Sequence, residues 1–355
     1  MAFWNKKIIN LDDRYLGLDL SDFSAKVFQL EKNGDSDRIR SYNSGDIKAG
    51  YIEDGRIVNQ EKVAEIIRDI IKEAGPKKIN TKKVICSIPE SKVFLRIISI
   101  PKVSLEEASE AIKWEIEPNI PLPVDQVYYD WQFLNEEDGK QNILTVAVVK
   151  DIADNLIKTM EQAGLSVYGL EMESVATVRS IVPQNSIAEK TYLIVDLGGE
   201  KTSFIITEDS IPYFTSSIPF SASNITQAIT DIFSVNLEEA EKIKINYGIE
   251  RSFKNNSIFD SIRPLLENVS KEIEKTMDFY QNLSQSKNKI GKIIISGGGA
   301  NLKGLVPYFT LRLGKETILG DPWINLNLGK RLPPISRENS IRYATVIGLA
   351  MRNNL

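Results

Sequence analysis

The chain has 355 residues, with 44 Lys and Arg against 48 Asp and Glu and a net charge of −4. This length is typical of two domains or of two lobes of one architecture. The balanced charge argues against a nucleic-acid partner, and the absence of histidine excludes Ser-His and Cys-His dyads and histidine-ligated zinc.

The first 90 residues are predicted to form three strands, a helix and a fourth strand. Residues 15–30, "YLGLDLSDFSAKVFQL", give an apolar strand that ends at Asp19, a polar turn and a second strand, which is the pattern of a β-hairpin. A strand near residues 38–47 follows. Within residues 58–78 the apolar side chains recur with a helical period, and a Gly-Pro pair ends the helix. The next strand, "KKVICSIP", contains the lone Cys86, which we interpret as a small core side chain.

Residues 91–167 are predicted to form a smaller unit, in which a strand, a helix, two strands and a second helix follow one another. The helix "SLEEASEAIKWEIE" begins with a predicted capping box, in which Ser104 is the N-cap and Glu107 stands three residues on. The proline-interrupted loop "EPNIPLP" follows, and then the strands "DQVYYDWQFL" and "NILTVAVVK" and the helix "DIADNLIKTMEQAG". We expect a compact α+β insertion.

A predicted helix around "EMESVATVRSI" and the polar stretch "VPQNSIAEK" lead into a second region. It opens with "YLIVDLGGEKTSFIIT", in which a strand, Asp196, a turn and a strand follow one another as they do around Asp19. Helices are predicted at "ASNITQAITDIFS", "NLEEAEKIKINYG" and "IRPLLENVSKEIEKTMDFYQNLS". A strand with a glycine turn, "KIIISGGGANLKGL", and the helix "SIRYATVIGLAMRNN" close the chain. The recurrence of Asp19 in Asp196 indicates two related lobes.

Three turns have the composition of phosphate or nucleotide sites. In "DLGG" two glycines would present backbone N–H groups to a phosphate oxygen, and the preceding Asp196 would hold a magnesium ion through water. In "DLSDFSAK", Lys26 and the hydroxyls of Ser21 and Ser24 are phosphate donors. In "IIISGGGANLKGL" the glycines let the backbone pass close to a flat ligand. Each turn alone has a purely conformational alternative, but their order and spacing favour a nucleotide site.

Together these stretches resemble the actin-like ATPase superfamily, in which two lobes close over ATP and Mg²⁺. "GLDLSDFSAK" and "VDLGGEKTSF" are similar to its two phosphate loops, and "ISGGGANLKGL" is similar to its adenosine loop. The resemblance covers nearly the whole chain and implies an α/β, two-lobed actin-like (ribonuclease H-like) fold with an inserted α+β subdomain. The implied division is a first lobe over 1–90, completed by 168–188 and 338–355, an inserted partner-binding subdomain over 91–167, and a second, nucleotide-binding lobe over 189–337.

The insertion points to the branch of the superfamily that contains the cell-division protein FtsA and the type IV pilus assembly protein PilM. "LGLDLSDFSAKVFQLEK", "LEMESVATVRSI" and the long stretch from "ICSIPESKVF" to "DQVYYDW" resemble the PilM family in particular. The FtsA family would add a C-terminal linker and an amphipathic membrane helix, whereas this chain ends at Leu355, just after the predicted closing helix. The resemblance therefore favours PilM.

The resemblance also implies roles for individual residues. Asp19 and Asp196 would face magnesium through water. The implied nucleotide-binding residues are Asp19, Ser21, Asp22, Ser24, Lys26, Asp196, Gly198, Gly199, Lys201, Thr202, Glu241, Lys244, Gly297, Gly298, Gly299 and Asn301. Glu241 and Lys244 have an exposed i,i+3 charge pair as their alternative.

Hydrolysis needs a polar side chain that orients water toward the γ-phosphate. Glu171 and Glu173, in the predicted helix between the lobes, are the catalytic candidates, with surface carboxylates as the alternative. The sequence departs from the family pattern in two places. In the first loop Ser21 stands where glycine is usual and is followed by Asp22, and in the second loop Glu200 stands where smaller residues are common. Each carboxylate would weaken nucleotide binding by repulsion unless it turns outward or reaches the metal. Slow or absent ATP hydrolysis fits this sequence.

The resemblance implies an ATP-binding scaffold of the type IV pilus inner-membrane platform, or of a type II secretion-like system. It would bind the N-terminal cytoplasmic peptide of a PilN-like membrane protein, together with other platform components. The aromatic side chains of Tyr128, Tyr129, Trp131 and Phe133 would suit an extended peptide, with an ordinary half-buried strand as the alternative. ATP bridging the lobes would act as a switch that biases the peptide groove or self-association.

No apolar segment approaches the ~18 residues that span a bilayer, and the start "MAFWNKKIINLDD" lacks a signal-peptide core. A lone cysteine fits a reducing compartment. We therefore expect a cytoplasmic protein that reaches the inner membrane through its partners. Two alternatives remain open: a filament-forming cell-division protein like FtsA, and a kinase of sugars or small acids on the same fold, for which we find no distinct motif.

Overall fold

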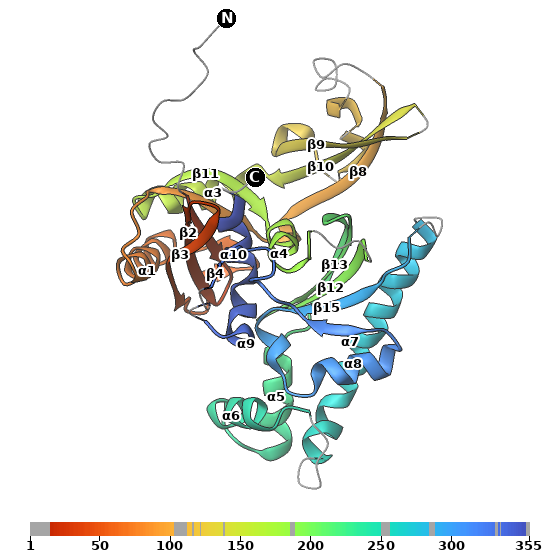
Figure 1. Cartoon of the computed structure of the whole chain (residues 1–355). Coiled ribbons are helices and arrows are strands. Elements are labelled where there is room, and N and C mark those ends of the chain that lie inside the picture. Colours follow the sequence, from red (N-terminus) through yellow and green to blue (C-terminus); the bar gives the residue numbers. More distant parts are fainter. Residues whose placement is uncertain are drawn as a thin grey trace, which may run out of the picture.

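The computed structural model describes residues 15–102, 112–115, 117–120, 122–137, 139–184, 189–249, 256–283, 288–330, 333 and 335–352. The chain forms two lobes, each built on a mixed sheet, and a smaller three-stranded subdomain that extends away from them (Figure 1). The predicted helix over 104–117, with its capping box at Ser104 and Glu107, lies largely outside the described residues.

The first lobe is built on a six-stranded sheet with the order β11-β7-β1-β2-β3-β6. The five residues of β1 are all buried because this strand lies inside the sheet, antiparallel to β2 and parallel to β7, with helices on both faces. The strands of the lobe are β1 (Leu16–Leu20), β2 (Ser24–Asn33), β3 (Ser36–Asp46), β6 (Gly75–Pro76), β7 (Lys83–Ile88) and β11 (Ser166–Met172), with the short hairpin β4 (Ile52–Glu53) and β5 (Arg56–Ile57).

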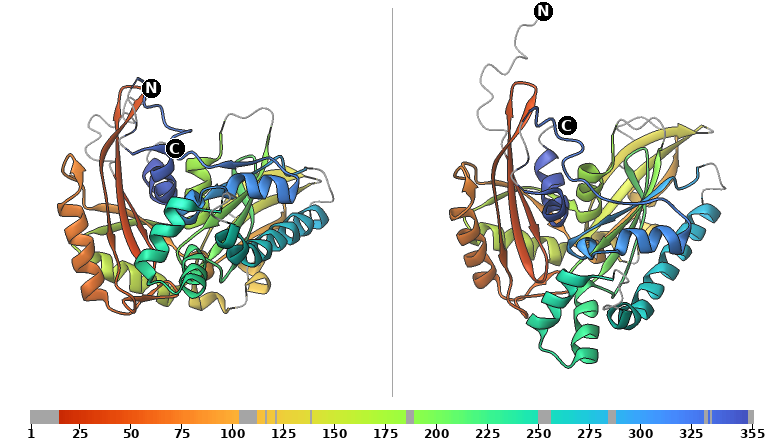
Figure 2. Two further views of the ribbon diagram at one scale, coloured as in Figure 1. Left: turned by 90° about the horizontal axis from the view of Figure 1, so that it is seen from below. Right: turned by 60° about the horizontal axis from the view of Figure 1, so that its bottom comes forward.

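Side chains alternate between the two faces of this sheet and meet different helices on each. Leu16 and Leu18 pack in one core with α1 (Gln60–Lys72) and α3 (Lys150–Gln162). Phe28 packs on the opposite face with α10 (Ala344–Met351). Figure 2 shows α1 and α10 on opposite sides of the sheet. The β-hairpin predicted for residues 15–30 is therefore present, and its apolar side chains alternate between the two faces of the sheet.

The position of α3 and β11 bears on the extent of the inserted subdomain. The helix α3 contributes to the core of the first lobe, and Val167 of β11 pairs with Val84 of β7. These contacts favour an insertion that ends near Val149 rather than at Val167. The structure also corrects one prediction: Glu171 lies in β11, because the predicted helix starts at Glu173 as α4 (Glu173–Ile181).

The inserted subdomain is an antiparallel sheet with the order β8-β10-β9. Its strands are β8 (Val93–Pro101), β9 (Val127–Glu137) and β10 (Lys140–Val149), with 3-10 turns η2 (Glu117–Asn119) and η3 (Val124–Gln126). One face packs in a cluster with Met172 and Ile211 of the two lobes. The opposite face encloses a separate small core around Ile100 and Ile143.

The second lobe repeats the topology of the first with a five-stranded sheet, β14-β13-β12-β15-β16. Its central strands β12 and β15 are parallel and fully buried over their isoleucine-rich runs, as strands covered on both faces are. The elements are β12 (Thr191–Leu197), β13 (Thr202–Glu208), β14 (Ile211–Ile218), α5 (Ala222–Phe233), α6 (Leu237–Tyr247), α7 (Asn256–Leu283), β15 (Lys292–Ser296), η4 (Gly298–Asn301), α8 (Leu305–Leu313) and β16 (Thr317–Leu319).

The helices α4 and α10 lie against each other where the two lobes meet (Figures 1 and 2). A Cβ on Gly348 would lie 1.8 Å from the carbonyl oxygen of Ala176, so only glycine lets the two backbones approach this closely. The short elements α9 (Arg337–Ser340) and η5 (Ile341–Tyr343) lead into α10. Among the helices of the described ranges, none is both long and apolar enough to cross a bilayer.

Candidate functional site

A cavity of about 310 Å³ lies between the lobes, at the carboxyl ends of β1 and β12. It brings together the first two predicted phosphate turns and the start of the third. The lining residues that the sequence predicted are Asp19, Ser21, Asp22, Ser24, Lys26, Glu173, Asp196, Gly198, Gly199, Lys201, Gly297 and Gly298. Segments from opposite ends of the chain therefore meet in one site, as the spacing predicted.

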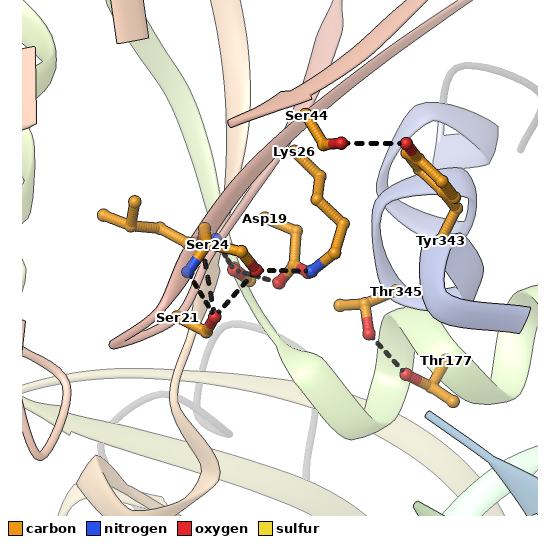
Figure 3. Close-up of polar contacts among 10 residues, drawn as sticks. Asp19, Ser21, Ser24, Lys26, Ser44, Thr177, Tyr343 and Thr345 are labelled. Carbon is orange, nitrogen blue, oxygen red and sulfur yellow. Dashed lines mark hydrogen bonds and ion pairs between the residues drawn. The ribbon is translucent and has the colours of Figure 1, made fainter. Parts of the chain in front are cut away.

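Asp19 is held in place by the hairpin that contains it. The β1–β2 register puts Lys26 opposite Asp19, and the Lys26 ammonium lies 3.1 Å from Asp19 Oδ2 and 3.0 Å from Ser24 Oγ (Figure 3). Ser87 of β7 donates a hydrogen bond of 3.0 Å to Asp19 Oδ1. Both carboxylate oxygens are thus engaged, and the Lys26 charge is directed into the site.

Asp196 is the counterpart of Asp19 in the second lobe. It lies beside Ser203 and Ser296 on the neighbouring strands, and Ser296 Oγ is buried without a hydrogen-bond partner among the described residues. Gly297 approaches so closely that a Cβ there would lie 2.3 Å from Asp196 Oδ1, and its φ of 84° also favours glycine. Burial, reinforced by the nearby Asp19 charge, raises the pKa of Asp196 to about 6. A cation near this carboxylate would relieve that cost.

The second phosphate turn is tightened by its own backbone. The Gly198 N–H donates to the Lys201 carbonyl at 3.0 Å, and a Cβ on Gly198 would lie 2.8 Å from the same oxygen. The Lys201 ammonium reaches 3.8 Å from Glu173 Oε2, so this turn contacts the first residue of α4 across the cleft.

The two catalytic candidates lie in different environments. Glu173 lines the cavity, and burial raises its pKa to about 7, with Lys201 opposing the rise. Glu171 does not line it: Arg179 contacts both Glu171 oxygens at 2.5 and 2.7 Å and also donates to the Gly348 carbonyl at 2.8 Å. The position of Glu173 suits a group that faces bound phosphates, whereas Glu171 ties β11 to α4 and α10.

Asp22 and Glu200, the two carboxylates that depart from the family pattern, both border the cavity. Asp22 accepts hydrogen bonds from the backbone N–H groups of Asp54 and Gly55, at 2.8 and 3.0 Å. Its charge is therefore used to hold the tip of the β4–β5 hairpin, although the side chain still borders the cavity. Partial desolvation, with the neighbouring Asp22, raises the pKa of Glu200 to about 7. The raised pKa favours the protonated Glu200 carboxyl, which lessens the expected repulsion of phosphate.

Five of the predicted nucleotide-binding residues do not line this cavity: Thr202, Glu241, Lys244, Gly299 and Asn301. Thr202 donates to the Phe220 carbonyl at 2.8 Å, and Asn301 donates to the Glu338 carbonyl at 2.7 Å. Glu241 and Lys244 form a 2.7 Å ion pair, and each also contacts Thr226 of α5. Gly299 packs against Leu197 and Ala222.

Sequence reasoning missed a further set of cavity residues: Phe23, Asp54, Gly55, Pro89, Ser91, Glu200, Ser203, Ser296, Ile341, Arg342, Ala344 and Thr345, of which only Glu200 had been singled out, as a departure. Ser203 and Ser296 adjoin the predicted turns and could have been found from β-register. Arg342 follows no recognisable motif, and its position depends on how the end of the chain packs beside α4. Thr345 is fixed there by a 3.0 Å hydrogen bond to Thr177 (Figure 3).

Two carboxylates with hard oxygen ligands, Asp19 and Asp196, fit a magnesium ion that keeps its waters. Within the described ranges, no three or more His, Cys, Asp or Glu side chains converge enough to enclose a metal ion alone. Phosphate oxygens and water would therefore supply the remaining ligands.

The four predicted aromatic residues lie on β9, which is an edge strand of the inserted sheet. Tyr129 and Trp131 pack against the Ile100 core, whereas Tyr128 and Phe133 are 47% and 45% exposed. Tyr128 and Tyr129 line a second cavity of about 620 Å³, together with Lys113, Trp114, Val124 and Lys150 among others. Trp114 is 75% exposed there, and the Lys150 ammonium lies 5.3 Å from the centre of the Tyr128 ring.

Comparison with protein families matches residues 17–354 to the model described as type IV pilus assembly protein PilM. Among curated proteins, the cell division protein FtsA of Enterococcus hirae is 25% identical over 338 residues, which cover 82% of this chain and 74% of FtsA.

Among solved structures, a chain of a PilM-PilN type IV pilus biogenesis complex superposes with a TM-score of 0.81 at 24% identity, covering 96% of this chain and 98% of that one. MreB 5 of Spiroplasma citri bound to AMPPNP superposes with a TM-score of 0.52 at 12% identity, covering 95% of both chains. These likenesses confirm the predicted fold class: two-lobed, actin-like α/β with an inserted α+β subdomain.

Proposed function

Because the chain belongs to the family of the type IV pilus assembly protein PilM, we propose that it binds Mg·ATP between its lobes and uses the nucleotide state to control a peptide-binding groove. Its place would be the assembly platform of the type IV pilus. The observation that carries the proposal is the convergence of Asp19, Lys26, Asp196 and the three glycine-containing or hydroxyl-rich turns on one cavity.

The residues that line the cavity would perform three tasks. Lys26, Ser21 and Ser24 of the first turn and the backbone N–H of Gly199 in the second would bind phosphate oxygens. Gly198, whose N–H donates to the Lys201 carbonyl, would hold the second turn in shape. Asp19 and Asp196 would hold the metal through water, and Mg²⁺ when bound neutralises charge on the phosphates. Gly297 and Gly298 would let the nucleoside lie against the backbone of the second lobe. The resemblance further implies that Glu241 and Lys244 contact the ribose and adenine and that Asn301 lies beside the adenosine, and both expectations remain part of the proposal.

Glu173 is the residue best placed to orient water toward a terminal phosphate. It is the first residue of α4, where the helix dipole favours the ionised carboxylate, while burial raises its pKa to about 7. A carboxyl that titrates near neutrality can accept a proton from water. Glu173 Oε2 also contacts the Lys201 ammonium. Hydrolysis would therefore be slow unless Lys201 moves from this oxygen to a phosphate.

The partner would be the N-terminal cytoplasmic peptide of a PilN-like inner-membrane protein. The solved PilM-PilN complex supports this partner. In the described residues no strand pairs with the outer edge of β9, so a peptide could add main-chain hydrogen bonds there. The cavity beside Trp114, Tyr128 and Tyr129 offers apolar contact area. Its rim carries charges of both signs, from Lys113 and Lys150 and from Glu117 and Asp125. The protein would reach the inner membrane through this partner and other platform components.

Calorimetric titration tests the nucleotide half of the proposal directly. ATP with Mg²⁺ should bind at one site per chain, and ATP without Mg²⁺ should bind more weakly. Asp196→Ala should lower the Mg·ATP affinity, whereas Asp35→Ala, an exposed aspartate in the β2–β3 turn, should not. Equal Mg·ATP affinities of Asp196→Ala and the unmodified protein would contradict the assignment of Asp196 as a residue that faces the metal.

A further inference from the structure

The 3-10 turn η1 (Glu90–Lys92) lies where both phosphate turns and the inserted subdomain come together. It directly precedes β8, the strand that carries the chain into that subdomain. Two separate sets of contacts reach η1, one from each lobe. Each set begins at a residue that lines the nucleotide cavity.

The first set starts at Asp22 in the first phosphate turn. Asp54 and Gly55, both with positive φ, form the two-residue turn of the β4–β5 hairpin, and Asp22 accepts both of their N–H groups. The hairpin tip in turn contacts η1. Asp54 binds Lys92 at 2.6 Å and accepts from Ser91 Oγ at 3.4 Å.

Packing reinforces these polar contacts. A Cβ on Gly55 would lie 2.5 Å from the ring of Pro89, the residue immediately before η1. The hairpin tip is therefore packed directly against η1, and Asp22 links this tip to the first phosphate turn.

The second set starts at Lys201 in the second phosphate turn. Lys201 contacts Glu173 Oε2 at 3.8 Å, and the same oxygen accepts from the Glu90 backbone N–H at 3.4 Å. Glu90 itself is buried, with Ser174 of α4 and Thr215 of β14 as polar neighbours of its carboxyl group. Residues of η1 also contact β14 of the second lobe.

We propose that η1 is a relay that transmits nucleotide binding in the cleft to β8 and thereby to the peptide groove, with Lys92 as its positioning residue. The inference rests on the proposed nucleotide-binding function and specifies how that site would be coupled to the inserted subdomain. A phosphate that draws Lys201 away from Glu173 would free the oxygen that faces Glu90. A phosphate that displaces Asp22 would shift the hairpin tip against Pro89 and Lys92.

Lys92 is a suitable point for a test because its ion pair with Asp54 is partly exposed, the Asp54 side chain being 74% accessible. Such pairs contribute little to stability, so Lys92→Met should fold. Lys102 provides a matched control at the other end of β8, where it binds the exposed Glu136 at 2.9 Å.

The experiment measures hydrogen–deuterium exchange of residues 93–101 with and without saturating Mg·ATP, after calorimetry has established Mg·ATP binding by each variant. In the unmodified protein and in Lys102→Met, Mg·ATP should change β8 exchange by about 5-fold or more. In Lys92→Met the change should be lost although Mg·ATP still binds, and Lys92→Arg should restore it.

Mg·ATP binding with an unchanged β8 response in Lys92→Met would overturn the relay and leave the proposed nucleotide site intact. The relay would also be wrong if the unmodified protein binds Mg·ATP without any change in β8 exchange. Absence of Mg·ATP binding by the unmodified protein would overturn the proposed function itself, and the relay with it.

Discussion

Replacing Asp196 by Asn should stabilise the empty protein while removing its response to magnesium. Burial and the nearby Asp19 charge raise the pKa of Asp196 from its ordinary 3.8 to about 6. At pH 8 the ionised carboxylate therefore costs the folded state about 3 kcal/mol relative to a neutral side chain. Asn has nearly the same shape and no charge, so Asp196→Asn should recover much of this free energy of unfolding.

The pH dependence gives this prediction its sign. The folded protein binds the Asp196 proton more tightly than the unfolded chain does, so this carboxyl lowers stability as pH rises from about 4 through 6. The advantage of Asp196→Asn should be about 3 kcal/mol at pH 8 and about half of that at pH 5. Thermal and urea unfolding at the two pH values measure it, with Asp35→Asn as an exposed control. A variant that is less stable than the unmodified protein at pH 8, or equally stabilised at both pH values, would refute the electrostatic reasoning.

Three other outcomes are expected. Mg·ATP affinity should fall as pH drops below about 6, because Asp196 must be ionised to face the metal. Calorimetry of Asp196→Asn should show a smaller dependence, since only the other carboxyls of the cavity still titrate. Lys26→Met should weaken ATP binding by about 10-fold or more, the loss of a charge-assisted hydrogen bond, whereas Lys32→Met, an exposed lysine on the same strand, should bind normally. Trp114→Ala should weaken binding of the PilN-like peptide by about 10-fold or more, as an aromatic anchor does, and leave Mg·ATP affinity unchanged. Equal peptide affinity of Trp114→Ala and the unmodified protein would show that the peptide does not bind beside Trp114.

The parts of the site that sequence reasoning found are those fixed by local order along the chain. Asp19 and Asp196 each end a buried strand before a turn, and this pattern places both at the same edge of their sheets. Lys26 was predicted because it stands seven residues after Asp19, where the family that the sequence resembles can have a phosphate-binding lysine, and the hairpin register of the structure puts it opposite Asp19. In each case the relevant contact spans only a few residues or repeats a recognisable motif.

The parts that it missed depend on contacts between distant segments. Asp22 was expected to approach a phosphate, but its carboxylate caps backbone N–H groups that lie more than 30 residues away in the chain. Glu171 was placed at the start of the helix predicted around "EMESVATVRSI", yet it lies in β11, which pairs with β7. That strand contains Gly169 and is only partly buried, so its alternating pattern is weak. The environment of Glu173 and Glu90 exists only where the two lobes meet, so no sequence pattern could have predicted it.

The most direct test of the account is the affinity of the PilN-like N-terminal peptide with and without saturating Mg·ATP, measured by fluorescence anisotropy. If nucleotide binding between the lobes controls the groove, Mg·ATP should change the peptide affinity by about 5-fold or more, and by linkage the peptide should change Mg·ATP affinity by the same factor. Asp196→Asn should show neither effect. Identical peptide affinity in the unmodified protein with and without bound Mg·ATP would contradict the account.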